Sequence, residues 1–297
     1  MSAPAFDDRD PLARLIDRLD LAPAGPDRFE ARPTTGMRRL FGGLIAAQSA
    51  VAAMRSVEGA RLHSLHGYFL RAGRPGVPLG FEVARLRDGL SFASRRVVAR
   101  QGGEAIFELL ASFTDRETGI EHAYEPAAGD ALATDPESLP DWESVRSRET
   151  GEPPRAPDAV EVRVVQPEHD RPGVDAPPHR AVWLRTRGAL PDDPALHAAI
   201  LIYASDRTLL RTAARLHGGM RDRLPASLDH AVWLHRAPGA AFRLDQWLLY
   251  VSETPIASGG RALVHGRMLT RDGARVASVA QEGLLRRRRA TTAGPSA

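Results

Sequence analysis

The sequence predicts an α+β fold made of two repeats, each with an antiparallel sheet wrapped around a central helix. Two observations support this prediction. Apolar helical segments near residues 50 and 200 are each followed by closely spaced strand-like segments. The patterns SLHGYFL and SLDHAVWL also begin 163 residues apart, at Ser64 and Ser227. One apolar helix can fill the concave side of each sheet, and the two sheets can join edge to edge.

In the first half, residues 10–21 place Leu12, Leu15 and Leu19 at helical spacing, and residues 41–57 form the stronger helix prediction, with most faces apolar. Strands are predicted at 29–33, 62–71, 79–86, 91–100 and 104–114. Turn signals such as Arg87-Asp88-Gly89 separate consecutive strands by short intervals, which favours antiparallel hairpins.

The same plan returns after residue 158. A helix is predicted at 194–216, with Pro194 in its first turn and Gly218-Gly219 after its end. Strands are predicted at 159–165, 180–187, 226–236, 245–254, 260–270 and 274–285. Residues 125–158 are instead rich in Pro, Ser and acidic residues, which is typical of a linker or surface-wrapping segment.

These boundaries divide the chain into an N-terminal repeat, a Pro-rich linker, a C-terminal repeat and a flexible tail. The expected ranges are 1–124, 125–158, 159–290 and 291–297.

Composition excludes several classes of function. The chain has no Cys, so disulfides, zinc-thiolate sites and thiol nucleophiles are excluded. Its net charge is only +3 and charges of both signs are interspersed, which argues against a nucleic-acid partner. No apolar run is long enough for a membrane span, and the N-terminus has no apolar signal region, so a cytoplasmic protein is expected.

Several phrases resemble the bacterial type II acyl-CoA thioesterase family and its peroxisomal counterparts, which have a double hotdog fold. The phrases are RRLFGGLIAAQ (38–48), LHSLHGYFLRAG (62–73), LRDGLSFASRRV (86–97), IFELLASF (106–113), YASD (203–206), ASLDHAVWLHR (226–236), QWLLYVSETPIASGGRALVHGRM (246–268) and DGARVASVAQEGLLR (272–286). The resemblance covers nearly the whole chain outside the linker. It implies a homo-oligomeric enzyme that hydrolyses acyl-CoA to fatty acid and CoA.

In that family a catalytic Asp, a Ser or Thr and a Gln act together, and the matching positions here are Asp206, Ser227 and Gln281. Such a set suits thioester hydrolysis, because a carboxylate can accept a proton from water while hydroxyl and amide groups orient that water. No metal and no cofactor is expected. The oxyanion could be bound by a backbone N–H near Gly42 and Gly43 at a helix N-terminus.

Without the resemblance, each residue also has a structural interpretation. Asp206 lies on an apolar helix face and could cap a neighbouring element. Ser227 could be a strand-start hydroxyl on the same face as Asp229 and Trp233, and Gln281 an edge-strand polar group.

Arginines and histidines offer further candidate sites. Arg95, Arg96 and Arg286 to Arg289 could bind CoA phosphates or form a solvated surface. The histidine pairs His63/His66 and His230/His235 have no nearby acidic cluster, so core or surface roles are favoured over a metal site.

Two alternatives remain open for the function. A hotdog enoyl-CoA hydratase would need an Asp and a His on a strand-to-helix loop, and a non-catalytic acyl-CoA-binding protein could use the same pocket. Ser227 does not lie in a G-x-S-x-G elbow, which disfavours a Ser-His-Asp hydrolase.

The first half has Gln48 and His66 near the positions of Asp206 and Asp229, so we expect the second half to supply the active centre.

Overall fold

The computed structural model describes residues 10–34, 39–115, 119–125, 129–171, 173–220 and 223–287. The first half contains α1 (Pro11–Leu19), β1 (Ala22–Pro23), β2 (Arg28–Ala31), α2 (Gly42–Met54), β3 (Arg61–Phe69), β4 (Leu79–Asp88), β5 (Ala93–Gln101) and β6 (Glu104–Thr114). The connecting segment contains α3 (Gly129–Ala133), the 3₁₀ turn η1 (Pro136–Ser138) and α4 (Trp142–Thr150).

The second half contains the strands and the apolar helix of the repeated plan, with η2, α6 and β9 in addition. In chain order, the elements are β7 (Val160–Val164), the 3₁₀ turn η2 (Pro167–Asp170), β8 (His179–Thr186), α5 (Pro194–Ser205), α6 (Leu209–Arg215), β9 (Arg223–Ser227), β10 (Asp229–Leu234), β11 (Leu248–Ser258), β12 (Arg261–Leu269) and β13 (Arg275–Arg287). None of the helices in the described ranges is long and apolar enough to cross a bilayer.

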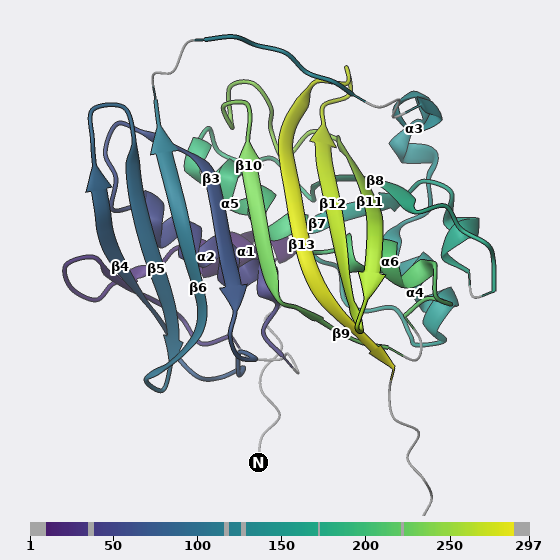
Figure 1. Cartoon of the computed structure of the whole chain (residues 1–297), viewed down its shortest axis with the longest axis horizontal. Coiled ribbons are helices and arrows are strands. Elements are labelled where there is room, and N and C mark those ends of the chain that lie inside the picture. Colours follow the sequence, from purple (N-terminus) through teal and green to yellow (C-terminus); the bar gives the residue numbers. More distant parts are fainter. Residues whose placement is uncertain are drawn as a thin grey trace, which may run out of the picture.

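Within the described residues, 13 strands form one antiparallel sheet, and its two halves have corresponding strand orders outward from the centre (Figure 1). β3 pairs with β10 at the centre, with Leu65 opposite Val232. Outward from this join the order is β3-β6-β5-β4-β2-β1 on one side and β10-β13-β12-β11-β8-β7 on the other, while β9 pairs with β13. The strands that carry SLHGYFL and SLDHAVWL therefore occupy equivalent places, as predicted.

The two apolar helices α2 and α5 lie together behind the sheet (Figure 1). Their side chains are buried on nearly all faces; Ala46, Ala50 and Ile200 to Ile202 have no measurable exposure. A Cβ on Gly43 would lie only 2.7 Å from the carbonyl oxygen of Tyr203. Glycine therefore allows the N-terminus of α2 to approach the C-terminal part of α5 closely.

Two predicted elements are divided in the structure. The helix predicted at 194–216 is interrupted between Ser205 and Leu209, so that Asp206 caps the C-terminus of α5. The strand predicted at 226–236 is interrupted at Leu228, which separates β9 from β10.

The segment predicted as a linker is more ordered than its composition indicates. α4 begins at an N-cap, where Asp141 Oδ1 accepts from the backbone N–H of Ser144 at 3.1 Å, and ends at Gly151, which has φ of 71°. Arg146 and Glu149 of α4 are buried. Buried charged side chains therefore help to hold this part of the connecting segment against the rest of the protein. The tail predicted at 291–297 lies outside the described residues.

Candidate active site

Asp206 lies in the break between α5 and α6, and its carboxylate receives hydrogen bonds from two strands. Ser227 Oγ at the end of β9 donates to Asp206 Oδ1 at 3.2 Å. Gln281 Nε2 on β13 donates to the same oxygen at 2.6 Å. The structure therefore brings together the three residues singled out in the sequence, which come from separate elements.

The position of Ser227 depends on a β-bulge at Leu228. Ser227 pairs with Gly283 of β13, whereas Ala231 pairs with Ala280. Between these two pairs, the chain advances four residues from Ser227 to Ala231 but only three from Ala280 to Gly283 on β13. The additional residue on the β9–β10 side reverses which side chains face the helices. Ser227 therefore faces the helices, like Gln281, instead of sharing the outer face with Trp233, which is 42% exposed. The sequence interpretation of one shared face for Ser227 and Trp233 was wrong for this reason.

Gln281 is 1% exposed, and its carbonyl Oε1 has no hydrogen-bond partner among the described residues. A buried amide oxygen without a partner carries a desolvation cost of about 1–3 kcal/mol. Since Nε2 of the same amide is fixed on Asp206, Oε1 is an acceptor held beside the carboxylate.

The N-terminus of α2 completes the surroundings of Asp206. A Cβ on Gly42 would lie 3.0 Å from Asp206 Oδ2 and 3.0 Å from the ring of Phe69. The N-cap residue of α2, Phe41, makes no side-chain capping bond. Asp206 Oδ2 therefore points toward the first turn of a helix, where backbone N–H groups favour negative charge.

His230, for which the sequence favoured a core or surface role, belongs to a buried polar group near Asp206. His230 Nε2 and Ser205 Oγ are 2.7 Å apart, and Tyr250 Oη donates to the carbonyl of Ser205 at 2.9 Å. Burial lowers the pKa of His230 and raises the pKa of Tyr250, so both side chains are neutral near pH 7. The available signal was the alternation of β10, which places His230 with Val232 and Leu234 on the buried face.

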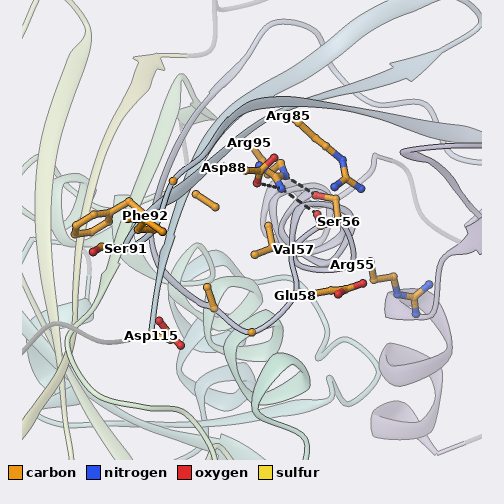
Figure 2. A pocket seen from close by; sticks show the side chains of 15 residues that line it. Arg55, Ser56, Val57, Glu58, Arg85, Asp88, Ser91, Phe92, Arg95 and Asp115 are labelled. Atoms are coloured by element: carbon orange, nitrogen blue, oxygen red, sulfur yellow. Dashed lines mark hydrogen bonds and ion pairs between the residues drawn. The ribbon is translucent and has the colours of Figure 1, made fainter.

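A cavity of about 580 Å³ lies elsewhere, at the C-terminal end of α2 (Figure 2). It is lined by residues 55–60, which connect α2 directly to β3, and by the β4–β5 turn. Arg95 borders this cavity but is 1% exposed, and its guanidinium donates to Ser56, Asp88 and two backbone carbonyls. All its N–H donors are engaged within the protein, with Ser56 after α2 and with the β4–β5 region, so Arg95 is not available to CoA phosphates.

The other arginines considered for phosphate binding also lie away from Asp206 or outside the described part. Arg96 is on the outer face of the sheet, where its Nε donates to Glu108 at 2.6 Å. Arg286 is exposed, and Arg288 and Arg289 lie outside the described residues.

Gln48, the first-half residue compared with Asp206 in the sequence, is buried. It lies in the middle of α2, where its Nε2 donates to the carbonyl of Arg18 at 2.7 Å. The C-cap residue of α2 is Arg55. The side chains of His66 and Asp229 lie 3.3 Å apart across the join.

The other two histidines considered as pairs in the sequence have hydroxyl partners. His63 Nε2 lies 2.9 Å from Ser112 Oγ, and His235 Nε2 lies 2.8 Å from Ser278 Oγ. In the described ranges, no three His, Asp or Glu side chains are grouped as metal ligands would be.

Comparison with known proteins identifies the relatives of this chain. Two family models match, one described as acyl-CoA thioesterase over residues 155–284 and one as acyl-CoA thioesterase N-terminal domain over 31–114. Acyl-coenzyme A thioesterase 8 of Mus musculus is 37% identical, and the match covers 90% of this chain and 87% of that protein.

Solved structures show the same relation at the level of the fold. The acyl-CoA thioesterase II TesB2 of Mycobacterium marinum superposes with a TM-score of 0.77 at 40% identity, over 93% of this chain and 99% of that one. A hot dog fold protein of Alicyclobacillus acidocaldarius gives a TM-score of 0.74 at 20% identity, over 92% and 98% of the two chains. The chain thus has the hotdog fold, twice over, and it belongs to the acyl-CoA thioesterase family.

Proposed function

We propose that this protein hydrolyses acyl-CoA to free fatty acid and CoA by direct attack of water, with Asp206 as the proton acceptor. The observation that carries this proposal is the convergence of Ser227 and Gln281 on Asp206 Oδ1, beside the N-terminus of α2. Family membership supports the reaction, and the geometry supports the roles of the residues.

The two hydrogen bonds fix the plane of the Asp206 carboxylate. In the proposed mechanism, Oδ2 accepts a proton from the attacking water while the unpartnered Gln281 Oε1 accepts a hydrogen bond from its other O–H. The water oxygen bonds to the thioester carbon, and the oxyanion lies near the backbone N–H groups of Gly42 and Gly43. The C–S bond then breaks, and the thiolate of CoA takes the proton from Asp206.

The geometry favours this reaction over the alternative of a hydratase. A hydratase of this fold would pair an Asp with a His, but the side-chain donors to Asp206 are Ser227 and Gln281. His230 instead bonds to Ser205. Release of free thiol from acyl-CoA distinguishes an enzyme from a non-catalytic acyl-CoA-binding protein.

Replacing Asp206 by Asn tests the proposal. This nearly isosteric change removes the proton acceptor, so kcat should fall by roughly 10²–10⁴-fold with little change in KM. Ser227→Ala and Gln281→Ala should each cost less, and their effects should be non-additive because they act on one carboxylate. Thiol release and the fatty-acid product are measured in parallel. A burst of CoA with mass added at Ser227 would contradict direct attack by water.

We also propose that the protein forms a homo-oligomer. Tyr68, Leu110 and Trp233 are 55%, 55% and 42% exposed, and they lie on neighbouring strands near the central join. Large apolar side chains gathered on one outer face favour contact with another protein surface. The molar mass of the purified chain in solution tests this proposal.

A further inference from the structure

Asp206 is not held by a continuous helix, because α5 ends at Ser205 and α6 begins at Leu209. Its position therefore depends on what holds the residues on either side of it. Two of these residues, Tyr203 and Arg207, both contact the carboxylate of Asp158. Asp158 itself lies outside the C-terminal repeat.

Asp158 lies at the end of the segment that connects the two halves, just before β7. Tyr203 Oη donates to Asp158 Oδ2 at 2.9 Å, and Arg207 Nη1 lies 2.5 Å from the same oxygen. Burial raises the pKa of Tyr203, which keeps its hydroxyl protonated as a donor. One carboxylate thus fixes the residues three positions before and one position after Asp206.

Asp158 is itself anchored to the edge of the sheet. Its Oδ1 accepts from the backbone N–H of Val160 in β7 at 3.0 Å. Its carbonyl accepts from Arg187 Nε, beyond the end of β8, at 3.0 Å. The carboxylate is therefore a fixed point and does not simply follow the movement of Tyr203 and Arg207.

The opposite side of Tyr203 faces the N-terminus of α2. The rings of Phe41 and Tyr203 meet edge to face, with centroids 5.2 Å apart. A Cβ on Gly43 would meet the Tyr203 carbonyl at 2.7 Å, and the adjacent Gly42 faces Asp206 Oδ2. A displacement of Tyr203 would therefore change the distance between the Asp206 carboxylate and the first turn of α2.

We propose that Asp158 is a positioning residue, which sets the geometry of Asp206 through Tyr203 and Arg207. This inference rests on the proposed catalytic role of Asp206. It gives the connecting segment a function in the reaction, in addition to joining the two halves.

A second ion pair, between α6 and the connecting segment, provides a matched control. Arg211 lies four residues after Arg207 and forms an ion pair with Glu149 of α4. This second pair also links the connecting segment to the region after Asp206, and Glu149 is 2% exposed in its side chain against 30% for Asp158. Glu149→Gln thus removes a more buried charge, one helical turn farther from Asp206.

The test compares Asp158→Asn with Glu149→Gln in the full-length protein, using kcat, KM and the melting temperature. Asp158→Asn should lower kcat by roughly 10- to 10²-fold, because small misplacements of a reacting group have effects of this size. KM should change by less than about threefold, because substrate contacts are kept. Glu149→Gln should lower the melting temperature at least as much, yet change kcat by less than about twofold.

Tyr203→Phe provides a second variant that keeps the ring against Phe41 and removes only the hydroxyl. It should lower kcat less than Asp158→Asn, and the double variant should be no worse than Asp158→Asn alone, because both act through one contact.

The inference is overturned if Asp158→Asn leaves kcat unchanged, or if Glu149→Gln lowers kcat as much as Asp158→Asn does. Asp158 would then have only a structural role. Full activity in Asp206→Asn would instead overturn the proposed function, so the two failures are distinguishable.

Discussion

The two oxygens of Asp206 have different surroundings, and this difference matters for its proposed role. Oδ1 is occupied by Ser227 and Gln281, whereas Oδ2 lies beside Gly42 and the ring of Phe69. The space next to Oδ2 exists because residue 42 has no side chain. In the proposed mechanism, a residue with a Cβ would place a carbon where the attacking water and the thioester carbonyl meet.

Gly42→Ala should therefore lower activity without unfolding the protein. Its Cβ would lie 3.0 Å from Oδ2, and displacement of reacting groups by such a contact should lower kcat by roughly 10- to 10²-fold. Alanine is favoured over glycine in helices by about 1 kcal/mol, which offsets part of the steric cost. Kinetics and urea unfolding of the same preparation measure both effects.

Gly80→Ala is the matched control, since a Cβ at Gly80 in β4 would meet nothing within 4 Å. Wild-type kcat in Gly42→Ala would show that the reacting groups do not lie on this side of Asp206.

At the scale of elements, the pattern of apolar residues predicted most of the fold. The strand predicted at 104–114 is β6 with the same limits, and the helix predicted at 41–57 contains α2. These predictions succeeded because alternation and helical spacing record which side chains face the core. Asp206, Ser227 and Gln281 were found by family resemblance, since as single residues each had an ordinary structural interpretation.

What the sequence could not provide was the exact interruption of two elements. Leu228 is an apolar residue within a regular strand pattern, and nothing in SLDHAVWL marks it as a bulge. The helical spacing likewise continues through Asp206, although α5 ends at Ser205. Both interruptions depend on tertiary contacts, and both lie beside the candidate site. α4 was not predicted; its buried Glu149 is paired with Arg211, which is distant in sequence.

At the scale of the whole molecule, the central join connects the two halves, and both halves contact the candidate site. The backbone N–H of Phe69 in β3 donates to the carbonyl of Leu228 at 2.8 Å, so the first half contacts the bulge that orients Ser227. α2 from the first half also faces Asp206 from the second. Each half thus contributes to the site, although its three polar residues all come from the second half.

The stability of the whole molecule should depend on pH through buried histidines. His197 and His230 have no measurable exposure, and burial is the main cause that lowers the pKa of each. His197 Nδ1 also accepts from the backbone N–H of Leu244 at 3.1 Å, a bond that protonation of Nδ1 would break. Both residues are therefore neutral in the folded protein and gain a proton more readily when it unfolds.

The sign of the effect follows from this difference. Because the folded-state pKa lies below the unfolded value of about 6.5, the unfolded chain binds more protons once the pH falls below that value. The free energy of unfolding should therefore be constant near pH 8 and decrease below about pH 6.5, by up to about 1.4 kcal/mol per pH unit for each such histidine. Carboxylates change the free energy of unfolding at lower pH. Asp245, whose pKa is lowered by its hydrogen bond to Arg243, loses its contribution to stability only below about pH 4.

Urea unfolding at pH 8, 7, 6 and 5 measures this slope. His197→Asn keeps an acceptor for Leu244 but cannot gain a proton, so it should lower stability at pH 8 and flatten the decrease between pH 6.5 and 5. An equal slope in the variant would show that His197 does not contribute. A wild-type stability that is constant down to pH 5 would exclude the neutral buried state for both histidines, because each proton bound only on unfolding must appear in the slope.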